Sequence, residues 1–282
     1  MNASHFYSIH TQKGLLLFDS PKVMGILNVS PDSFFDGGKY CQLAQSLTHI
    51  QEMIDEGMDI LDIGGVSTRP GSEEVEMEEE WLRIKDVLLA CATHFPTLLI
   101  SIDTFHAEIA RRAYEYGADI INDISGGQFD EKMFETVGKL KMPYILMHTQ
   151  NRPQNMQNNP NYTNICLDLM HYFSTQMDTA KKAGITDIIL DLGFGFGKTM
   201  AHNYELLNKM DFFKLLNAPM LVGISRKSML WKLLECTPEE ALNATTCVHT
   251  LALLNGAHIL RVHDVKQAKE CIKITEYYKT RD

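Results

Sequence analysis

Four times along the chain, an amphipathic stretch ends at a glycine and a short apolar run follows within a few residues. The glycines are Gly57, Gly117, Gly184 and Gly256. Glycine closes a helix by adopting the left-handed conformation after its last turn. A short run that is apolar on both faces is typical of a strand buried in a parallel sheet. The pattern therefore predicts repeated helix–turn–strand units.

The predicted helices of these units span residues 42–56, 107–116, 167–183 and 245–255, and the strands after them span 60–63, 120–121, 188–191 and 259–263. Four further apolar runs, at 23–28, 98–103, 144–148 and 220–224, bring the predicted strands to eight. Alternating strands and helices form either an open doubly wound sheet or a closed barrel. Eight units in 282 residues favour an α/β fold of the (β/α)8 TIM-barrel type, with one domain over residues 1–282.

The first segment does not fit the repeat. Residues 6–18 contain a turn at Gln12-Lys13-Gly14 and predict a β-hairpin, within residues 1–20, that covers the bottom of the barrel. Two other stretches are predicted to be solvent-facing: the Glu-rich run 73–80 as a solvated helix start, and residues 150–161 as a mobile loop.

Composition excludes several classes of protein. A net charge of −10 argues against nucleic-acid or anionic-membrane binding, which needs a positive surface. No apolar run is long enough to span a bilayer, and the N-terminus lacks the pattern of a secretory signal. The six cysteines form no C-x-x-C pair, so we expect reduced thiols in a cytoplasmic protein.

Polar residues end all eight predicted strands, where a barrel places its catalytic groups. They are Asn28, Asp62, Asp103, Asn122, His148, Asp191, Ser225 to Lys227, and Arg261 with His263. Taken singly, each is more often a helix cap or a turn former. Capping does not require Arg, Lys and His, however, and Arg261 and His263 share a strand face because alternate residues point the same way. The set predicts a site at the barrel mouth.

The kinds of side chain indicate the chemistry. The glycine-rich run 193–199 fails the phosphate-loop pattern, because Leu192 stands where its first glycine should be, and we expect Phe196 and Lys198 to project over the mouth. Two carboxylates, an amide and a lysine suit a flat heterocycle. Arg261, His263 and Asn28 suit a phosphate-bearing leaving group with a divalent metal. The run from Ser225 into the next helix predicts an anion site.

The ordered motifs resemble dihydropteroate synthases, the pterin-binding TIM-barrel family. They lie at residues 24–34, 64–71, 101–104, 121–123, 146–148, 191–198, 225–229 and 261–264, and so cover nearly the whole chain. The resemblance implies that 6-hydroxymethyl-7,8-dihydropterin pyrophosphate condenses with 4-aminobenzoate, with Mg²⁺, in folate biosynthesis. It also implies a homodimer, a sulfonamide target and dissociative substitution at the pterin methylene.

Site roles follow from the same resemblance. It implies that the pterin is held by Asp103, Asn122, Asp191 and Lys227; that Asn28 binds Mg²⁺; that Arg261, His263 and Thr68 face the pyrophosphate; and that Phe34, Arg69, Pro70, Phe196 and Ser228 frame the aminobenzoate. Further substrate contacts are Ile124, Met147 and Gly223. The catalytic set is Asp103, Asp191, Lys227 and Arg261.

Two departures and two alternatives accompany the resemblance. The family usually has Glu where Val66 stands and Pro where Leu192 stands, so we expect altered loop geometry at both. A pterin-binding methyltransferase barrel would share the pterin pocket, but it would not need the segments around Arg69 and Lys227. A barrel that binds pterin without turnover would be expected to have lost Asn28 or another site residue.

Overall fold

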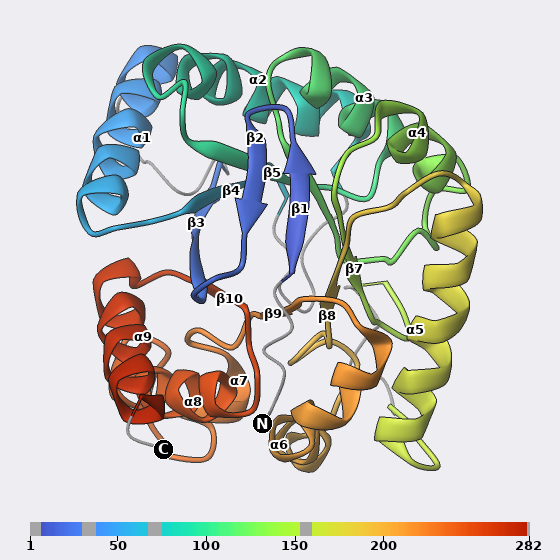
Figure 1. Ribbon diagram of the computed structural model, residues 1–282. Helices are drawn as coiled ribbons and strands as arrows, with labels where there is room; N and C mark the ends of the chain where they lie inside the picture. Colours follow the sequence, from blue (N-terminus) through green and yellow to red (C-terminus); the bar gives the residue numbers. More distant parts are fainter. Residues whose placement is uncertain (1–6, 30–37, 67–74, 153–159, 281–282) are drawn as a thin grey trace.

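The computed structural model describes residues 7–29, 38–66, 75–152 and 160–280. Eight parallel strands close into a barrel in the order β10-β3-β4-β5-β6-β7-β8-β9, which confirms the TIM barrel (Figure 1). The strands are β3 (Lys22–Asn28), β4 (Ile60–Gly64), β5 (Leu99–Asp103), β6 (Ile120–Asp123), β7 (Tyr144–Met147), β8 (Ile188–Asp191), β9 (Met220–Val222) and β10 (Ile259–Val262).

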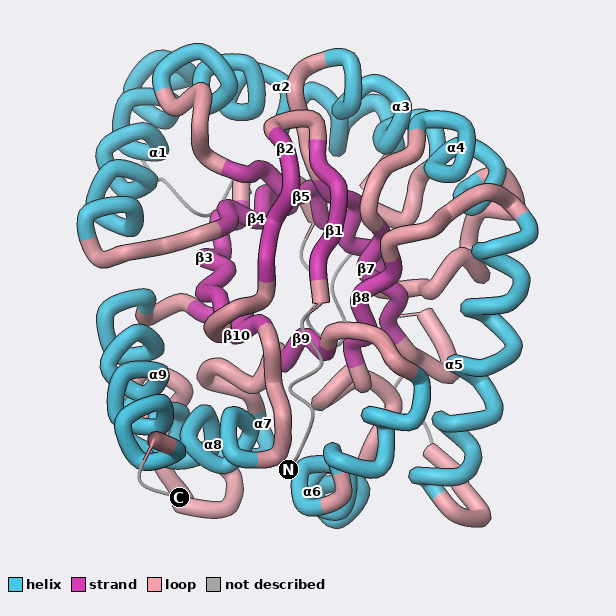
Figure 2. The backbone as a smooth tube through the Cα atoms, viewed as in Figure 1, coloured by secondary structure: helices cyan, strands magenta, loops and turns pink. Residues whose placement is uncertain are grey.

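Helices surround this barrel on the outside (Figure 2). They are α1 (Gly38–Asp55), α2 (Met77–His94), α3 (Ala107–Glu115), α4 (Met133–Leu140), α5 (Ile165–Lys182), α6 (Met200–Asn208), α7 (Ser228–Trp231), α8 (Leu242–Leu254) and α9 (Val265–Lys279), with a 3-10 helix at Met210–Leu216. The four glycines expected to close helices have φ between 95° and 102°. The left-handed conformation inferred for them is thus confirmed.

Side chains alternate between two cores along each strand. Outward-facing residues such as Ile63 and Ile102 pack against the helices in the larger core. Inward-facing residues form a second, smaller core inside the barrel: Met24, Ile60, Ile120, Ile145, Ile189, Leu221 and Ile259. The two-residue period of each strand therefore fills the barrel interior.

The N-terminal hairpin closes one end of this interior, as predicted (Figure 1). Strands β1 (Ser8–Thr11) and β2 (Gly14–Leu17) pair antiparallel, and Ile9 and Phe18 join the inner core. At the hairpin turn, the Lys13 ammonium donates to the buried Asp119 carboxylate at 2.6 Å and to the Leu98 carbonyl at 2.8 Å. The hairpin is thus fixed by both apolar and ionic contacts.

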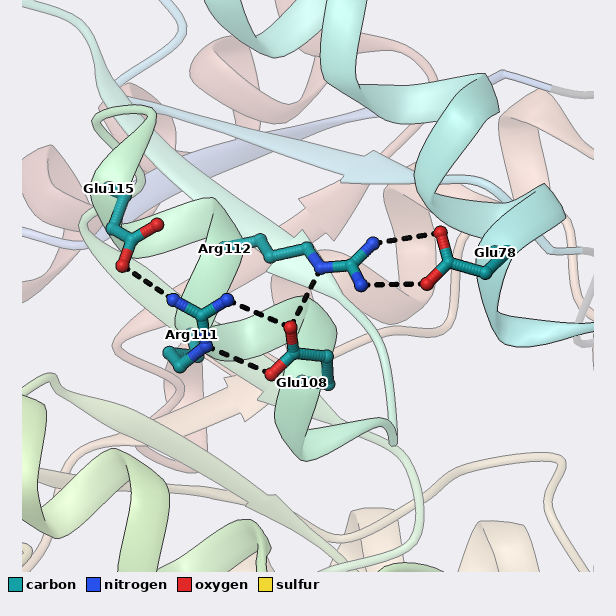
Figure 3. Close-up of polar contacts among 5 residues, drawn as sticks. All are labelled: Glu78, Glu108, Arg111, Arg112 and Glu115. Atoms are coloured by element: carbon teal, nitrogen blue, oxygen red, sulfur yellow. Dashed lines mark hydrogen bonds and ion pairs between the residues drawn. The ribbon is translucent and has the colours of Figure 1, made fainter.

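A series of ion pairs lies along the surface of α3 and reaches α2 at Glu78 (Figure 3). Arg112 donates to both carboxylate oxygens of Glu78, at 2.7 and 2.9 Å, and to Glu108 at 2.8 Å. Arg111 pairs with Glu108 and Glu115 on its own helix. Exposed pairs contribute little stability. Among the pairs named, only Arg112–Glu78 links α3 to α2, and the others lie within α3.

The prediction of a solvated glutamate run is wrong at one residue. Glu78 and Glu79 are exposed, but Glu80 is only 1% exposed, because it lies on the face of α2 that packs under Gly65. Burial raises the pKa of Glu80 to about 7, and the charge of Asp103 adds to this. Residues 67–74 lie outside the described part of the chain.

Candidate functional site

The inward-facing positions become polar at the end of the barrel opposite the hairpin. Asp62 lies two residues beyond Ile60, Asn122 beyond Ile120, Asp191 beyond Ile189, and Arg261 beyond Ile259. Because side chains alternate along a strand, each of these polar residues points to the same side as the apolar residue before it. One sequence period therefore makes both the apolar barrel core and its polar mouth.

Arg261 lies at the centre of the polar group. Its Nε donates to Asp62 Oδ2 at 2.6 Å, and its Nη2 donates to Asp103 Oδ2 at 2.7 Å. Asn122 Nδ2 donates to the same Asp62 oxygen at 3.1 Å. Burial opposes the charge of the guanidinium, but Asp62 and Asp103 outweigh it and raise the pKa of Arg261. Strands β10, β4, β5 and β6 are thus joined by one hydrogen-bonded cluster.

Asp191 and Lys227 lie beside Gly223. A Cβ at Gly223 would lie 3.8 Å from Lys227 Nζ, and 3.9 Å from both Asp191 Oδ2 and Arg261 Cβ. Burial raises the pKa of Asp191, whereas burial lowers the pKa of Lys227 to about 8 and Asp191 opposes that shift. The structure therefore brings Asp191, Lys227 and Arg261 together around one glycine.

Asp103 contacts Arg261 and is also influenced by the charge of Asp191. Burial raises its pKa; Asp62, Asp123 and Asp191 add to the rise, and Arg261 opposes it. Asp123 accepts hydrogen bonds from the Tyr144 hydroxyl at 2.5 Å and from the Ser125 and Gly127 amides. Those contacts hold the turn after β6, so of the adjacent pair Asn122-Asp123 only Asn122 is available to the mouth.

A small apolar surface lies beside these charges. Ile124, Met147 and Phe196 pack together, and Phe105 packs against them. Lys227 Nζ lies 4.5 Å from the centre of the Phe196 ring. An apolar wall with a few polar groups at its edge is typical of a site for a flat organic ligand. Phe105 was missed from the sequence, although its spacing of two from Asp103 was a signal.

Lys198 does not project over the mouth, and that prediction is wrong. Its ammonium is buried and donates to the carbonyls of Gly193 at 2.9 Å, Phe196 at 3.0 Å and His148 at 3.2 Å. It also lies 3.1 Å from His148 Nδ1. Burial, together with the charge of Lys198, lowers the pKa of His148 to about 2, so this imidazole stays neutral. Lys198 therefore holds the loop after β8.

This loop also contains the departure at Leu192. The leucine is fully buried in the outer core, and the next residue, Gly193, donates its amide to Asp191 Oδ1 at 2.8 Å. Asn203 accepts from the Gly195 amide at 2.7 Å. Side chains therefore fix the backbone here without a proline. At the other departure, Val66 is partly buried, and the residues that follow it lie outside the described part of the chain.

The predicted anion site at Ser225–Ser228 is only partly supported. Helix α7 has four residues, too few for a substantial dipole, and Arg226 is already paired with Asp264 at 2.7 and 2.9 Å. Ser225 Oγ lies 3.0 Å from His263 Nδ1. The residues that remain for an anion are Lys227 and Arg261, which face the mouth.

Asn28 fits a magnesium ligand. In the described ranges no group of three His, Cys, Asp or Glu side chains is placed to hold a metal. Asn28 Oδ1 and Asp103 Cβ lie 3.7 and 3.5 Å from where a Cβ on Gly64 would be, so the amide oxygen flanks the carboxylate cluster. Mg²⁺ commonly takes one or two protein oxygens and completes its shell with phosphates and water.

Four predicted site residues, Phe34, Thr68, Arg69 and Pro70, lie outside the described residues. The others from the sequence set lie on the mouth side of the barrel. Asp62 was noted there only as a strand end; its contact with two site residues could not be read from the sequence, because both partners are distant along the chain.

Comparisons with known proteins agree with this geometry. The family model described as pterin binding enzyme matches residues 24–263. Dihydropteroate synthase of Escherichia coli K12 is 43% identical over 258 residues, covering 91% of each chain. That of Bacillus subtilis is 41% identical over 271 residues, covering 95% of this chain and 92% of the relative.

Solved structures give the same result. The Yersinia pestis dihydropteroate synthase in a sulfonamide drug complex superposes with a TM-score of 0.91 at 39% identity, covering 97% of this chain and all of that one. The Xanthomonas albilineans enzyme with 4-aminobenzoic acid has a TM-score of 0.87 at 35% identity, covering 94% and 95%. The chain therefore belongs to the pterin-binding enzyme family and, within it, to the dihydropteroate synthases.

Proposed function

We propose that this chain joins 4-aminobenzoate to 6-hydroxymethyl-7,8-dihydropterin pyrophosphate, giving 7,8-dihydropteroate and pyrophosphate for folate biosynthesis. The observation that carries the proposal is that Asp191, Lys227 and Arg261 meet around Gly223 and that Arg261 also donates to Asp103. Support also comes from relatives: the Xanthomonas albilineans structure contains 4-aminobenzoic acid, and one from Clostridium difficile was solved with pteroic acid.

In this proposal, the pterin ring lies between the apolar wall and the acidic group. Asp103, Asn122 and Asp191 offer acceptors and an amide donor to its nitrogen edges, and Lys227 donates beside them. Ile124, Met147 and Phe196 cover a ring face. Carboxylates held in a dry pocket stabilise positive charge on the ring as the bond to the leaving group breaks.

The leaving group is assigned to the cationic side. Arg261 has five N–H donors, and two of them are used by Asp62 and Asp103. The other three have no acceptor among the described residues and are free for an anion. His263 and Thr68 are proposed to contact the pyrophosphate as well, although Thr68 lies outside the described residues. When bound through Asn28, Mg²⁺ would supply charge neutralisation for the pyrophosphate.

The chain supplies no nucleophile in this scheme. Pyrophosphate leaves the pterin methylene in a dissociative step, and the aminobenzoate amine then bonds to that carbon and loses a proton. The residues position the two substrates and exclude water. Phe34, Arg69, Pro70, Phe196 and Ser228 are proposed to frame the aminobenzoate, which makes sulfonamides expected competitors for the same place.

A pyrophosphate-release assay tests the function. Release should require both the pterin substrate and 4-aminobenzoate, and should depend on Mg²⁺. Binding of the pterin pyrophosphate by calorimetry without any release would support the non-catalytic barrel instead. Methyl transfer from a methylated pterin to a corrinoid, in place of release, would support the methyltransferase.

We also propose a homodimer formed through the surface of α8 and α9. These neighbouring helices expose Leu251, Leu254, Ile274, Tyr277 and Tyr278, with Ile274 67% accessible. Contiguous exposed apolar residues often mark an interface. Sedimentation of wild type and of Ile274→Glu should give a dimer and a weakened dimer, respectively.

We also propose a cytoplasmic location, which the free thiols of the described cysteines support.

Within the described ranges, no helix has the length and apolar character needed to cross a bilayer.

A further inference from the structure

We propose that Asp62 is a positioning residue that holds Arg261 and Asn122 for the reaction. This inference rests on the proposed function and deepens it. Asp62 Oδ2 accepts hydrogen bonds from Arg261 Nε at 2.6 Å and from Asn122 Nδ2 at 3.1 Å. One carboxylate oxygen thus contacts a residue assigned to the pyrophosphate and a residue assigned to the ring.

The geometry of the guanidinium explains why this contact positions Arg261. Nε is the donor nearest the stem of the side chain, so Asp62 fixes the plane of the group from behind. The terminal nitrogens stay available, one of them toward Asp103 at 2.7 Å. A bond at Nε therefore orients the guanidinium without occupying the donors that an anion would use.

The carboxylates of Asp62 and Asp103 lie at different depths, and we infer different roles for them. The Asp62 side chain is fully buried, whereas that of Asp103 is 9% accessible and flanks Asn28 at the rim. A substrate entering from the mouth can replace the contact of Arg261 with Asp103, but it cannot reach Asp62. Arg261 keeps its bond to Asp62 while Asp103 turns to the ring, so one buried charge couples leaving-group recognition to ring recognition.

Asp62→Asn tests this, because it keeps the shape but places a donor or a neutral acceptor against two donors. We expect the Kd for inorganic pyrophosphate with Mg²⁺ and the KM for the pterin pyrophosphate both to rise about tenfold or more, as is usual when a buried charged partner is lost. The KM for the aminobenzoate substrate should stay within about twofold, since the proposed aminobenzoate contacts do not involve Asp62.

Asp119→Asn is the matched control. Asp119 is also fully buried and also accepts from a cation at 2.6 Å, namely Lys13, but it lies at the hairpin end of the barrel. It should lower the melting temperature and leave both binding constants unchanged. If Asp62→Asn behaves in the same way, losing stability with unchanged pyrophosphate affinity, Asp62 is only structural and the inference is overturned.

A double variant keeps the test decisive if Asp62→Asn alone does not fold. Arg261→Met removes the buried cation that Asp62→Asn leaves with Asp103 as its remaining carboxylate partner, so the pair of changes is expected to fold. In the Arg261→Met background, Asp62→Asn should change pyrophosphate affinity less than about twofold. A further loss of about tenfold or more relative to Arg261→Met alone contradicts positioning through Arg261. The Kd for inorganic pyrophosphate can be measured whether or not wild type releases pyrophosphate, whereas the KM values require turnover, so a failure of the proposed function is seen separately.

Discussion

Lys227 Nζ lies 4.5 Å from the centre of the Phe196 ring while donating a 2.5 Å hydrogen bond to the carbonyl of Phe194. The ammonium therefore joins the polar edge of the mouth to its apolar wall. Burial lowers the pKa of Lys227 to about 8, and Asp191 limits the shift, so the group is mostly charged at neutral pH. Loss of this charge should therefore lower the rate of the reaction.

Lys227→Met keeps the aliphatic stem and removes the ammonium. We expect kcat/KM for the pterin pyrophosphate to fall about a hundredfold, because Asp191 is left buried without the cation that acts on it most strongly. Lys232→Met is the control, since Lys232 is an exposed cation over the Trp231 ring at 5.4 Å. Full turnover in Lys227→Met would remove Lys227 from the site.

Asp103→Ala should weaken binding of the pterin ring. Calorimetry with a pterin that lacks the diphosphate should show an affinity loss of about tenfold or more, since a buried acceptor for the ring is gone. Asp103→Asn keeps the shape and should lose less. Unchanged affinity in the alanine variant would show that the ring does not contact Asp103.

Removal of Mg²⁺ should act on the leaving group and not on the ring. With a chelator present, we expect the Kd for inorganic pyrophosphate to rise about tenfold or more, because Asn28 and Arg261 are then left without the metal charge. Binding of a pterin without diphosphate should not change. Asn28→Ala should reproduce the effect of the chelator, and an Asn28→Ala enzyme that still responds fully to Mg²⁺ would place the metal elsewhere.

Glu80→Gln should change how stability depends on pH. Burial raises the pKa of Glu80 to about 7, above its ordinary value of 4.5, while Thr104 and Arg83 oppose the rise and His106 Nε2 lies 3.7 Å from the carboxylate. Between these two pKa values the folded state binds more protons than the unfolded state. Relative to Glu80→Gln, wild type should therefore be fully stable below pH 4.5 and lose stability as pH rises through 7.

The size of that loss is about 3 kcal/mol if the whole shift is expressed, at about 1.4 kcal/mol per pKa unit. Urea unfolding of both proteins from about pH 4 to about pH 8 measures it. Parallel stability curves for wild type and Glu80→Gln would mean that the buried carboxyl does not titrate in this range.

Much of the fold could be predicted from the sequence, because the relevant signals are local. Gly57, Gly117, Gly184 and Gly256 each close a helix through their own backbone conformation, which does not depend on the rest of the chain. The alternation of side chains along a strand is also a local property. Arg261 lies two residues beyond Ile259, so the two side chains face the same way wherever the strand is placed. Strand ends such as Asp103 and Asp191 could be assigned to the mouth for the same reason.

Where the sequence predictions were wrong, the outcome depended on distant segments. Glu80 looks like its exposed neighbours until α2 packs under Gly65. Lys198 was expected in the mouth, but its ammonium donates to the carbonyl of His148, 50 residues earlier, as well as to the nearby carbonyls of Gly193 and Phe196. The four-residue length of α7 also had no local signal.

By itself, the sequence determined the strand count, the inward faces and the residues available at the mouth, since these follow from backbone conformation and a period of two. Only the tertiary structure decided which of those residues are paired. Asp62 and Arg261 are 199 positions apart, and their contact exists because closing the barrel brings β10 beside β3, whose other neighbour is β4. The buried charges of Asp62 and Arg261 neutralise each other only because the barrel closes.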